Sequence, residues 1–167
     1  MTLDIPKIMQ KSLIINNLEF AKSQLKLDDS LAVDDLMRLS EMLANKGKSQ
    51  IKFQLAGASK RFSHPSLHLA IKANLVTTCQ RCLDEMTVNL DVNFDYLITS
   101  AALNEAEDND EIDWLEENHE MDVGTLIEDE LLLAMPIAPT HAHDCSKLST
   151  QSGEKPNPFA VLKGLIK

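Results

Sequence analysis

The stretch Thr77-Thr78-Cys79-Gln80-Arg81-Cys82-Leu83-Asp84 places two cysteines three positions apart, between two long runs that alternate polar and apolar residues. The apolar residues before it share one parity: Leu67, Leu69, Ile71, Ala73 and Leu75. Those after it do the same: Met86, Val88, Leu90, Val92, Phe94, Tyr96 and Ile98. Successive side chains of a strand point to opposite faces, so both runs predict strands with one buried face. The cysteines therefore lie at or near the turn of a long β-hairpin.

The sequence on either side of the hairpin predicts helices and one more strand. Helical spacing of apolar residues and a capping residue indicate helices from Asn16 or Asn17 to Lys26, from Asp29 or Ser30 to Leu43, and from Val123 to Met135. Alternation predicts a strand over Gln50 to Ala56. A turn is expected at Leu27 to Ser30, and a polar loop at Gly57 to Pro65, whose Lys60, Arg61 and His64 are able to contact phosphate.

These elements predict an α+β fold: an antiparallel sheet with a long central hairpin, helices packed on one face, an acidic loop and an extended C-terminal tail. The outer parity of the second hairpin strand is polar, which is typical of a sheet with one solvated face. We expect one domain over residues 1–145, with 100–120 as an acidic insert, and a linker and docking tail over residues 146–167. The tail joins a Pro156-x-Pro158 step to apolar residues from Phe159 onwards.

Composition places the chain among ordinary globular proteins, with 44% apolar and 25% charged residues in 167. Its three cysteines are an odd number, which favours reduced thiols or a metal site over a disulfide framework. The N-terminus has no apolar run typical of a signal peptide, and no run is long enough to span a bilayer. We therefore expect a soluble, cytoplasmic protein.

Charge is distributed unevenly within the net charge of −10, because residues 82–146 contain 18 acidic residues and no lysine or arginine. A one-sided block of this kind favours a basic partner over nucleic acid, whose phosphates require cations. Within it we expect Trp114, Glu116 and Glu117 to contact such a partner, with Phe159 of the tail. The alternative is that the acidic segment is simply a solvated loop.

Zinc is the metal indicated by Cys79, Cys82 and Cys145 together with His141 or His143, of which we select His141. A C-x-x-C turn supplies two ligands at the separation that zinc requires. Two alternatives remain: the cysteines are small buried apolar residues, or the pair is a thiol–disulfide centre. The acidic surroundings oppose a thiolate. No other catalytic motif occurs, so we expect neither an enzyme nor a small-molecule substrate.

Three motifs resemble a known family when taken in order. They are Cys79-Gln80-Arg81-Cys82; Glu128-Asp129-Glu130-Leu131 with Pro136, Pro139, His141 and Cys145 after it; and Lys155-Pro156-Asn157-Pro158-Phe159-Ala160-Val161-Leu162. Together they resemble the YceD family, the large ribosomal RNA subunit accumulation proteins of bacteria. The resemblance implies a non-enzymatic ribosome biogenesis factor that supports synthesis, processing or accumulation of 23S ribosomal RNA. It implies as partners a ribosomal RNA precursor, a basic ribosomal protein or an assembly intermediate.

Overall fold

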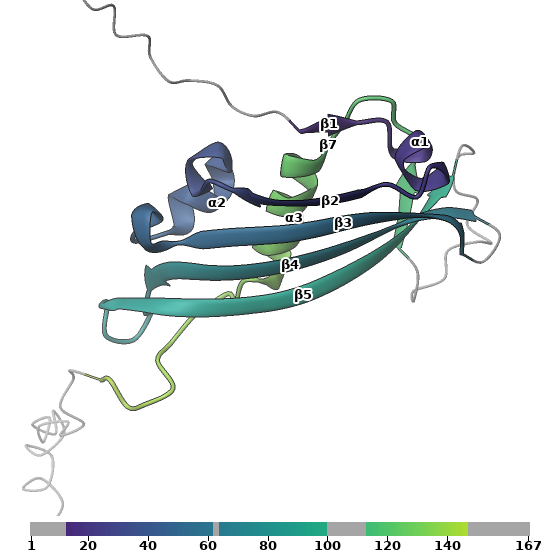
Figure 1. Cartoon of the computed structure of the whole chain (residues 1–167). Helices are drawn as coiled ribbons and strands as arrows, with labels where there is room; N and C mark the ends of the chain where they lie inside the picture. Colours follow the sequence, from purple (N-terminus) through teal and green to yellow (C-terminus); the bar gives the residue numbers. More distant parts are fainter. Residues whose placement is uncertain (1–12, 62–63, 100–112, 147–167) are drawn as a thin grey trace, which may run out of the picture.

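The computed structural model describes residues 13–61, 64–99 and 113–146. Within these ranges the chain forms strands, three α-helices and two 3-10 turns (Figure 1). In chain order they are β1 (Ile14–Ile15), α1 (Asn17–Lys22), β2 (Lys26–Leu31), η1 (Val33–Asp35), α2 (Met37–Met42), η2 (Lys46–Lys48), β3 (Gln50–Arg61), β4 (His64–Thr78), β5 (Glu85–Thr99), β6 (Asp113–Glu116), β7 (Met121–Asp122) and α3 (Val123–Ala134).

The main sheet has five strands in the order β2-β3-β4-β5-β6, and β1 pairs with β7 in a small separate sheet. Strands β2 to β5 are antiparallel, whereas β6 runs parallel to the end of β5 at Tyr96–Thr99. The β4–β5 hairpin is continuous from Ser66↔Leu97 to Thr78↔Glu85. The predicted α+β fold, with a long central hairpin, is therefore confirmed.

One face of the sheet forms the core, as the alternation in β4 predicts. Leu69, Ile71 and Leu75 are fully buried there, and α3 packs on the same side with a stripe of Val123, Ile127 and Leu131. Figure 1 shows α2 and α3 on this one face of the sheet. The Asp122 carboxylate accepts a hydrogen bond from the Gly124 N–H at 2.9 Å and begins α3 where the sequence predicts.

Two predictions for the residues between the first helix and the hairpin are wrong. The turn predicted at Leu27 to Ser30 is wrong, because these residues belong to β2 and pair with β3. The helix predicted from Asp29 or Ser30 is also wrong at its start: only η1 and the shorter α2 are helical. Asp and Ser favour turns and caps locally, but here strand pairing with β3 outweighs that preference.

The predicted polar loop from Gly57 to Pro65 is wrong as well, because β3 continues to Arg61 and β4 begins at His64. Gly57 is needed for close packing rather than for a turn. A Cβ atom built on it would lie 2.4 Å from the carbonyl oxygen of Phe20 in α1. A residue type common in loops therefore marks the place where a helix crosses the sheet.

Part of the segment predicted as an acidic loop is a strand. Residues 113–116 form β6, while 100–112 lie outside the described residues, as does the tail from 147. No helix among the described residues is long and apolar enough to cross a membrane.

Candidate metal centre

The two cysteines of the C-x-x-C motif are held by the turn that joins β4 to β5. Cys79 follows the last residue of β4, and its N–H donates to the Asp84 carbonyl at 2.9 Å. The Leu83 N–H donates back to the Cys79 carbonyl at 2.9 Å, and Leu83 takes a positive φ of 65°. This tight turn buries both cysteines, and it places Cys79 inward as its parity predicts.

The second half of the site comes from the segment after α3. The helix ends before Pro136, and the chain then reaches the hairpin turn, where the Pro139 carbonyl accepts the Gln80 N–H at 2.8 Å. This backbone bond brings the segment that carries His141 and Cys145 onto the turn. Two stretches some sixty residues apart in sequence thereby form one site.

The four ligand atoms of Cys79, Cys82, His141 and Cys145 all lie within 4.8 Å of one another. The Sγ atoms of Cys79 and Cys145 are 3.6 Å apart, and Cys82 Sγ is 3.4 Å from His141 Nδ1. A tetrahedral zinc ion, at about 2.3 Å from sulfur and about 2.0 Å from nitrogen, spaces its ligand atoms about 3.5–3.8 Å apart. All three cysteines are free thiols. The residues that the sequence analysis selected therefore form a set able to hold a metal.

Arg81 fixes the second segment from the side of the turn. Its Nη2 donates to the His141 carbonyl at 2.8 Å and to the His143 carbonyl at 2.5 Å. Its Nε donates to the Cys145 sulfur at 3.2 Å. One guanidinium thus orients a ligand and the backbone around it, as outer-shell groups of metal sites do. Sequence reasoning places Arg81 only within the C-x-x-C motif and gives it no role.

The surroundings of Cys79 and Cys82 shift the pKa values of the two thiols in opposite directions. Burial raises the pKa of Cys79, but the backbone N–H groups of Cys82 and Arg81 outweigh it and lower that pKa to about 5. For Cys82 the Asp84 N–H lowers the pKa, while burial and the Cys145 and Cys79 sulfurs raise it to about 11. The backbone N–H groups thus favour a thiolate at Cys79, in opposition to the acidic residues in the surrounding sequence.

The residues predicted to contact a partner lie elsewhere. Trp114 and Glu116 belong to β6, which pairs with the end of β5 farthest from the cysteine turn. Trp114 is half-buried, and its ring packs edge-on against His64 at 5.1 Å between centroids. Its buried Nε1 has no hydrogen-bond partner among the described residues. Glu116 is exposed and Glu117 follows it, whereas Phe159 lies outside the described residues.

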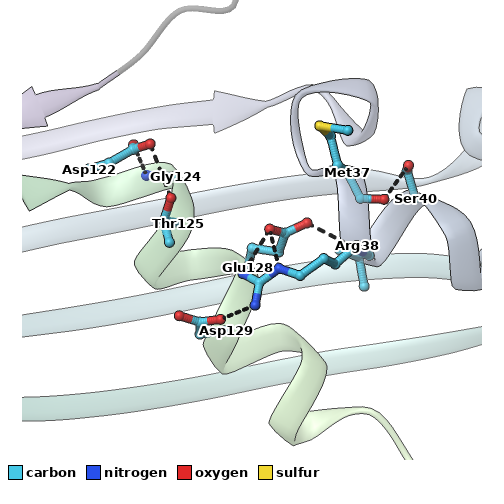
Figure 2. Close-up of polar contacts among 9 residues, drawn as sticks. Met37, Arg38, Ser40, Asp122, Gly124, Thr125, Glu128 and Asp129 are labelled. Carbon is cyan, nitrogen blue, oxygen red and sulfur yellow. Dashed lines mark hydrogen bonds and ion pairs between the residues drawn. The ribbon is translucent and has the colours of Figure 1, made fainter.

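A second polar site joins α2 to α3 (Figure 2). Glu128 is only 7% exposed, and its carboxylate accepts from Arg38 Nε and Nη2 at 3.0 and 2.9 Å and from the Leu39 N–H at 3.1 Å. Asp129 contacts Arg38 Nη1 at 2.7 Å. A cavity of about 520 Å³ adjoins this cluster. Sequence reasoning missed it, although Glu128 lies three residues before buried Leu131, at the margin of the apolar stripe.

Comparison with known proteins gives the family of the chain. Residues 67–166 match the family described as "Large ribosomal RNA subunit accumulation protein YceD". The chain belongs to the YceD family. The match spans the β4–β5 hairpin, α3 and all four metal-ligand candidates, whereas α2 and its Arg38 lie outside it.

A similar YceD-family relative is the "Large ribosomal RNA subunit accumulation protein YceD" of Haemophilus influenzae, which is 36% identical over 100 residues. That alignment covers 52% of this chain and 57% of the relative, so it spans little more than half of each. No solved structure matches the chain. The fold is therefore described from the structure of this chain, without a related solved structure.

Proposed function

We propose that this chain supports the accumulation of large-subunit ribosomal RNA by binding, with zinc as a structural clamp. The observation that carries the proposal is the closed Cys3His set of Cys79, Cys82, His141 and Cys145. Four protein ligands complete a tetrahedron and leave no position for a substrate, which is typical of structural rather than catalytic zinc. The accumulation role itself is supported by membership of the YceD family.

The donor set fits zinc in particular. Thiolate and imidazole donors are the ligands of structural zinc sites, whereas magnesium and calcium prefer oxygen. The proton still held at Cys82, whose pKa is about 11, would be released when the metal binds. Metal analysis of protein purified without a metal-affinity tag tests the site. We expect about one zinc per chain, and a ratio near zero would contradict the clamp.

The partner is proposed from charge. Residues 82–146 carry 18 acidic residues without a lysine or arginine, which suits a basic ribosomal protein within an assembly intermediate. The cations lie mainly in residues 1–81, with 12 Lys and Arg, and suit a ribosomal RNA precursor. Exposed Asp113 and Glu116 on β6 offer part of the acidic surface.

Affinity capture at low and high salt tests this partnership. We expect ribosomal protein or precursor RNA to be enriched at low salt, and less so for Glu116→Lys with Glu117→Lys. Glu41→Lys, a single charge reversal at an exposed position of α2 outside residues 82–146, is the control and should not lower the capture of ribosomal protein. Capture of no ribosomal component at low salt would show that the binding proposal is wrong.

A thiol–disulfide activity at the same turn is the second candidate. It is favoured by the Cys79 pKa of about 5 and by the 3.6 Å between the Cys79 and Cys145 sulfurs. It is opposed by the complete burial of Cys79, which hides the sulfur from another protein's disulfide. Rapid alkylation of Cys79 in protein as purified, with no bound metal, would favour this candidate over the clamp.

A further inference from the structure

The outer edge of β5 is unprotected over much of its length. β6 pairs only with Tyr96–Thr99, and no described segment pairs with that edge between Met86 and Phe94. The strand contains no proline there, and its register with β4 has no bulge. Proline, bulges and inward charges are the usual means by which a protein protects a strand edge. This edge therefore offers backbone donors and acceptors to an added strand.

The core face of β5 along this stretch is only partly covered by the described segments. Val88, Leu90, Val92 and Phe94 are only half-buried, while their partners across the ladder on β4 are at most 2% exposed: Leu75, Ala73, Ile71 and Leu69. The core-facing side chains of β5 are therefore much less buried than those of the adjacent strand β4. An apolar surface next to an open strand edge suits an apolar segment that adds as a strand.

We propose that this chain's own C-terminal segment, residues 159–166, covers the β5 edge from Met86 to Phe94. The segment reads Phe-Ala-Val-Leu-Lys-Gly-Leu-Ile, which is apolar apart from one lysine and one glycine. Residues 147–167 hold four lysines and one acid, opposite in sign to residues 82–146. The apolar residues therefore match the half-buried face of β5. Lys163 is opposite in charge to the acidic residues of β5, of which Asp91 is already paired with Lys72 of β4 at 3.2 Å.

The tether allows this docking. The described chain ends at Ser146, beside Cys145, at the turn where β5 begins. Twelve residues lie between Ser146 and Phe159, and the thirteen Cα–Cα steps span up to about 45 Å when extended. The edge from Met86 to Phe94 is about 26 Å long at about 3.3 Å per residue. Attachment at the metal centre thus gives the segment a high effective concentration at the edge.

A second copy of the chain is a poorer occupant. Two β5 strands paired edge to edge would bring their acidic solvated faces together, and the strand itself contains no lysine or arginine, although Lys72 of β4 pairs with Asp91. The docking is independent of the ribosomal role, so the capture experiment above and the test below can fail separately.

Amide hydrogen exchange of the full-length protein tests the proposal. We expect slow exchange over Met86–Phe94 in the wild type, and at least about ten-fold faster exchange in Phe159→Asp with Val161→Asp. The matched control is Ser152→Asp with Asn157→Asp, which adds the same charge at polar tail positions and should leave β5 unchanged. The amides of β3 and β4 report whether the fold itself is intact.

Equally fast β5 exchange in the wild type and in Phe159→Asp with Val161→Asp would overturn the proposal. Protection that disappears on dilution would also overturn it, because a second copy would then cover the edge. An independent measurement uses carbodiimide, which joins a lysine directly to a carboxylate. We expect crosslinks within one monomer from Lys163 to acidic residues of β5, and their absence in a monomer counts equally against the docking.

Discussion

The Sγ atoms of Cys79 and Cys145 lie 3.6 Å apart, although 66 positions separate the two residues in sequence. This contact links the turn of the central hairpin to the segment that leaves α3. The helix α3 packs on the sheet, and the segment that follows it returns to the β4–β5 turn (Figure 1). The helix and its following segment therefore contact the hairpin region at two separate points. A metal at this point would constrain both the domain and the start of the C-terminal tail.

His141 and His143 form a matched pair for testing the metal centre. Only His141 brings a ring nitrogen into the ligand set, whereas His143 is exposed and contributes its carbonyl to Arg81. We expect His141→Ala to lower zinc affinity by at least about ten-fold and to lower the melting temperature. His143→Ala should change neither quantity. Competition with a chromogenic chelator measures the affinity, and equal losses in both variants would contradict the assignment.

Glu128 should be essential for the packing of α2 on α3. Replacement by alanine leaves Arg38 without its main partner and the buried Leu39 N–H without an acceptor. We expect Glu128→Ala to lower the free energy of unfolding by about 2–3 kcal/mol. Asp129→Ala removes the more exposed of the two ion pairs of Arg38. It should lower the free energy of unfolding by less than about 1 kcal/mol. Urea unfolding measures the free energy of unfolding of both variants. Similar decreases in the two would contradict the prediction that the buried Glu128 contributes more than the exposed Asp129.

The raised pKa of the Tyr96 phenol predicts that the protein loses stability at alkaline pH. Burial raises the pKa of this phenol above its ordinary value of 10.0, and the Glu130 carboxylate, 2.5 Å from the hydroxyl, raises it further. The fold therefore favours the neutral phenol. That contribution is present below about pH 10 and is lost as the pH rises through the folded-state pKa. We expect Tyr96→Phe to cost about 1–2 kcal/mol near neutral pH, with the difference from the wild type shrinking in alkali.

Tyrosinate absorbance measures this directly, because Tyr96 is the only tyrosine in the chain. The folded protein should ionise at higher pH than the same chain in denaturant. Ionisation at the same pH in both states would contradict the predicted shift.

Gly57 should not tolerate a side chain. An alanine Cβ would lie 2.4 Å from the Phe20 carbonyl oxygen and 2.8 Å from the Ala21 Cα, and both are backbone atoms that cannot rotate away. We expect Gly57→Ala to cost about 1–3 kcal/mol. Gly47→Ala is the control, since its Cβ would approach nothing closer than 3.8 Å. Thermal melts compare the two, and an unchanged melting temperature for Gly57→Ala would show that α1 can move off the sheet.

Much of the fold was predictable because its signals are local. Alternation over residues 67–98 fixes which side chains of β4 and β5 face the core, and Asp122 marks the start of α3. β2 was not predictable, since Asp28, Asp29 and Ser30 favour turns and only pairing with β3 makes them a strand. The interaction of Glu128 with Arg38 was not predictable for the same reason, because a partner on another helix produces no periodic pattern in the sequence.

The sequence by itself determined the hairpin, its turn with Cys79 and Cys82, and the types of residue available as ligands. The tertiary structure added that His141 and Cys145 lie on the hairpin turn, that Arg81 donates to Cys145, and that no described strand pairs with the outer edge of β5 between Met86 and Phe94. The physical reason is range. Periodicity and capping depend on neighbours within a few residues, whereas these contacts join segments some sixty positions apart that meet only when α3 packs on the sheet.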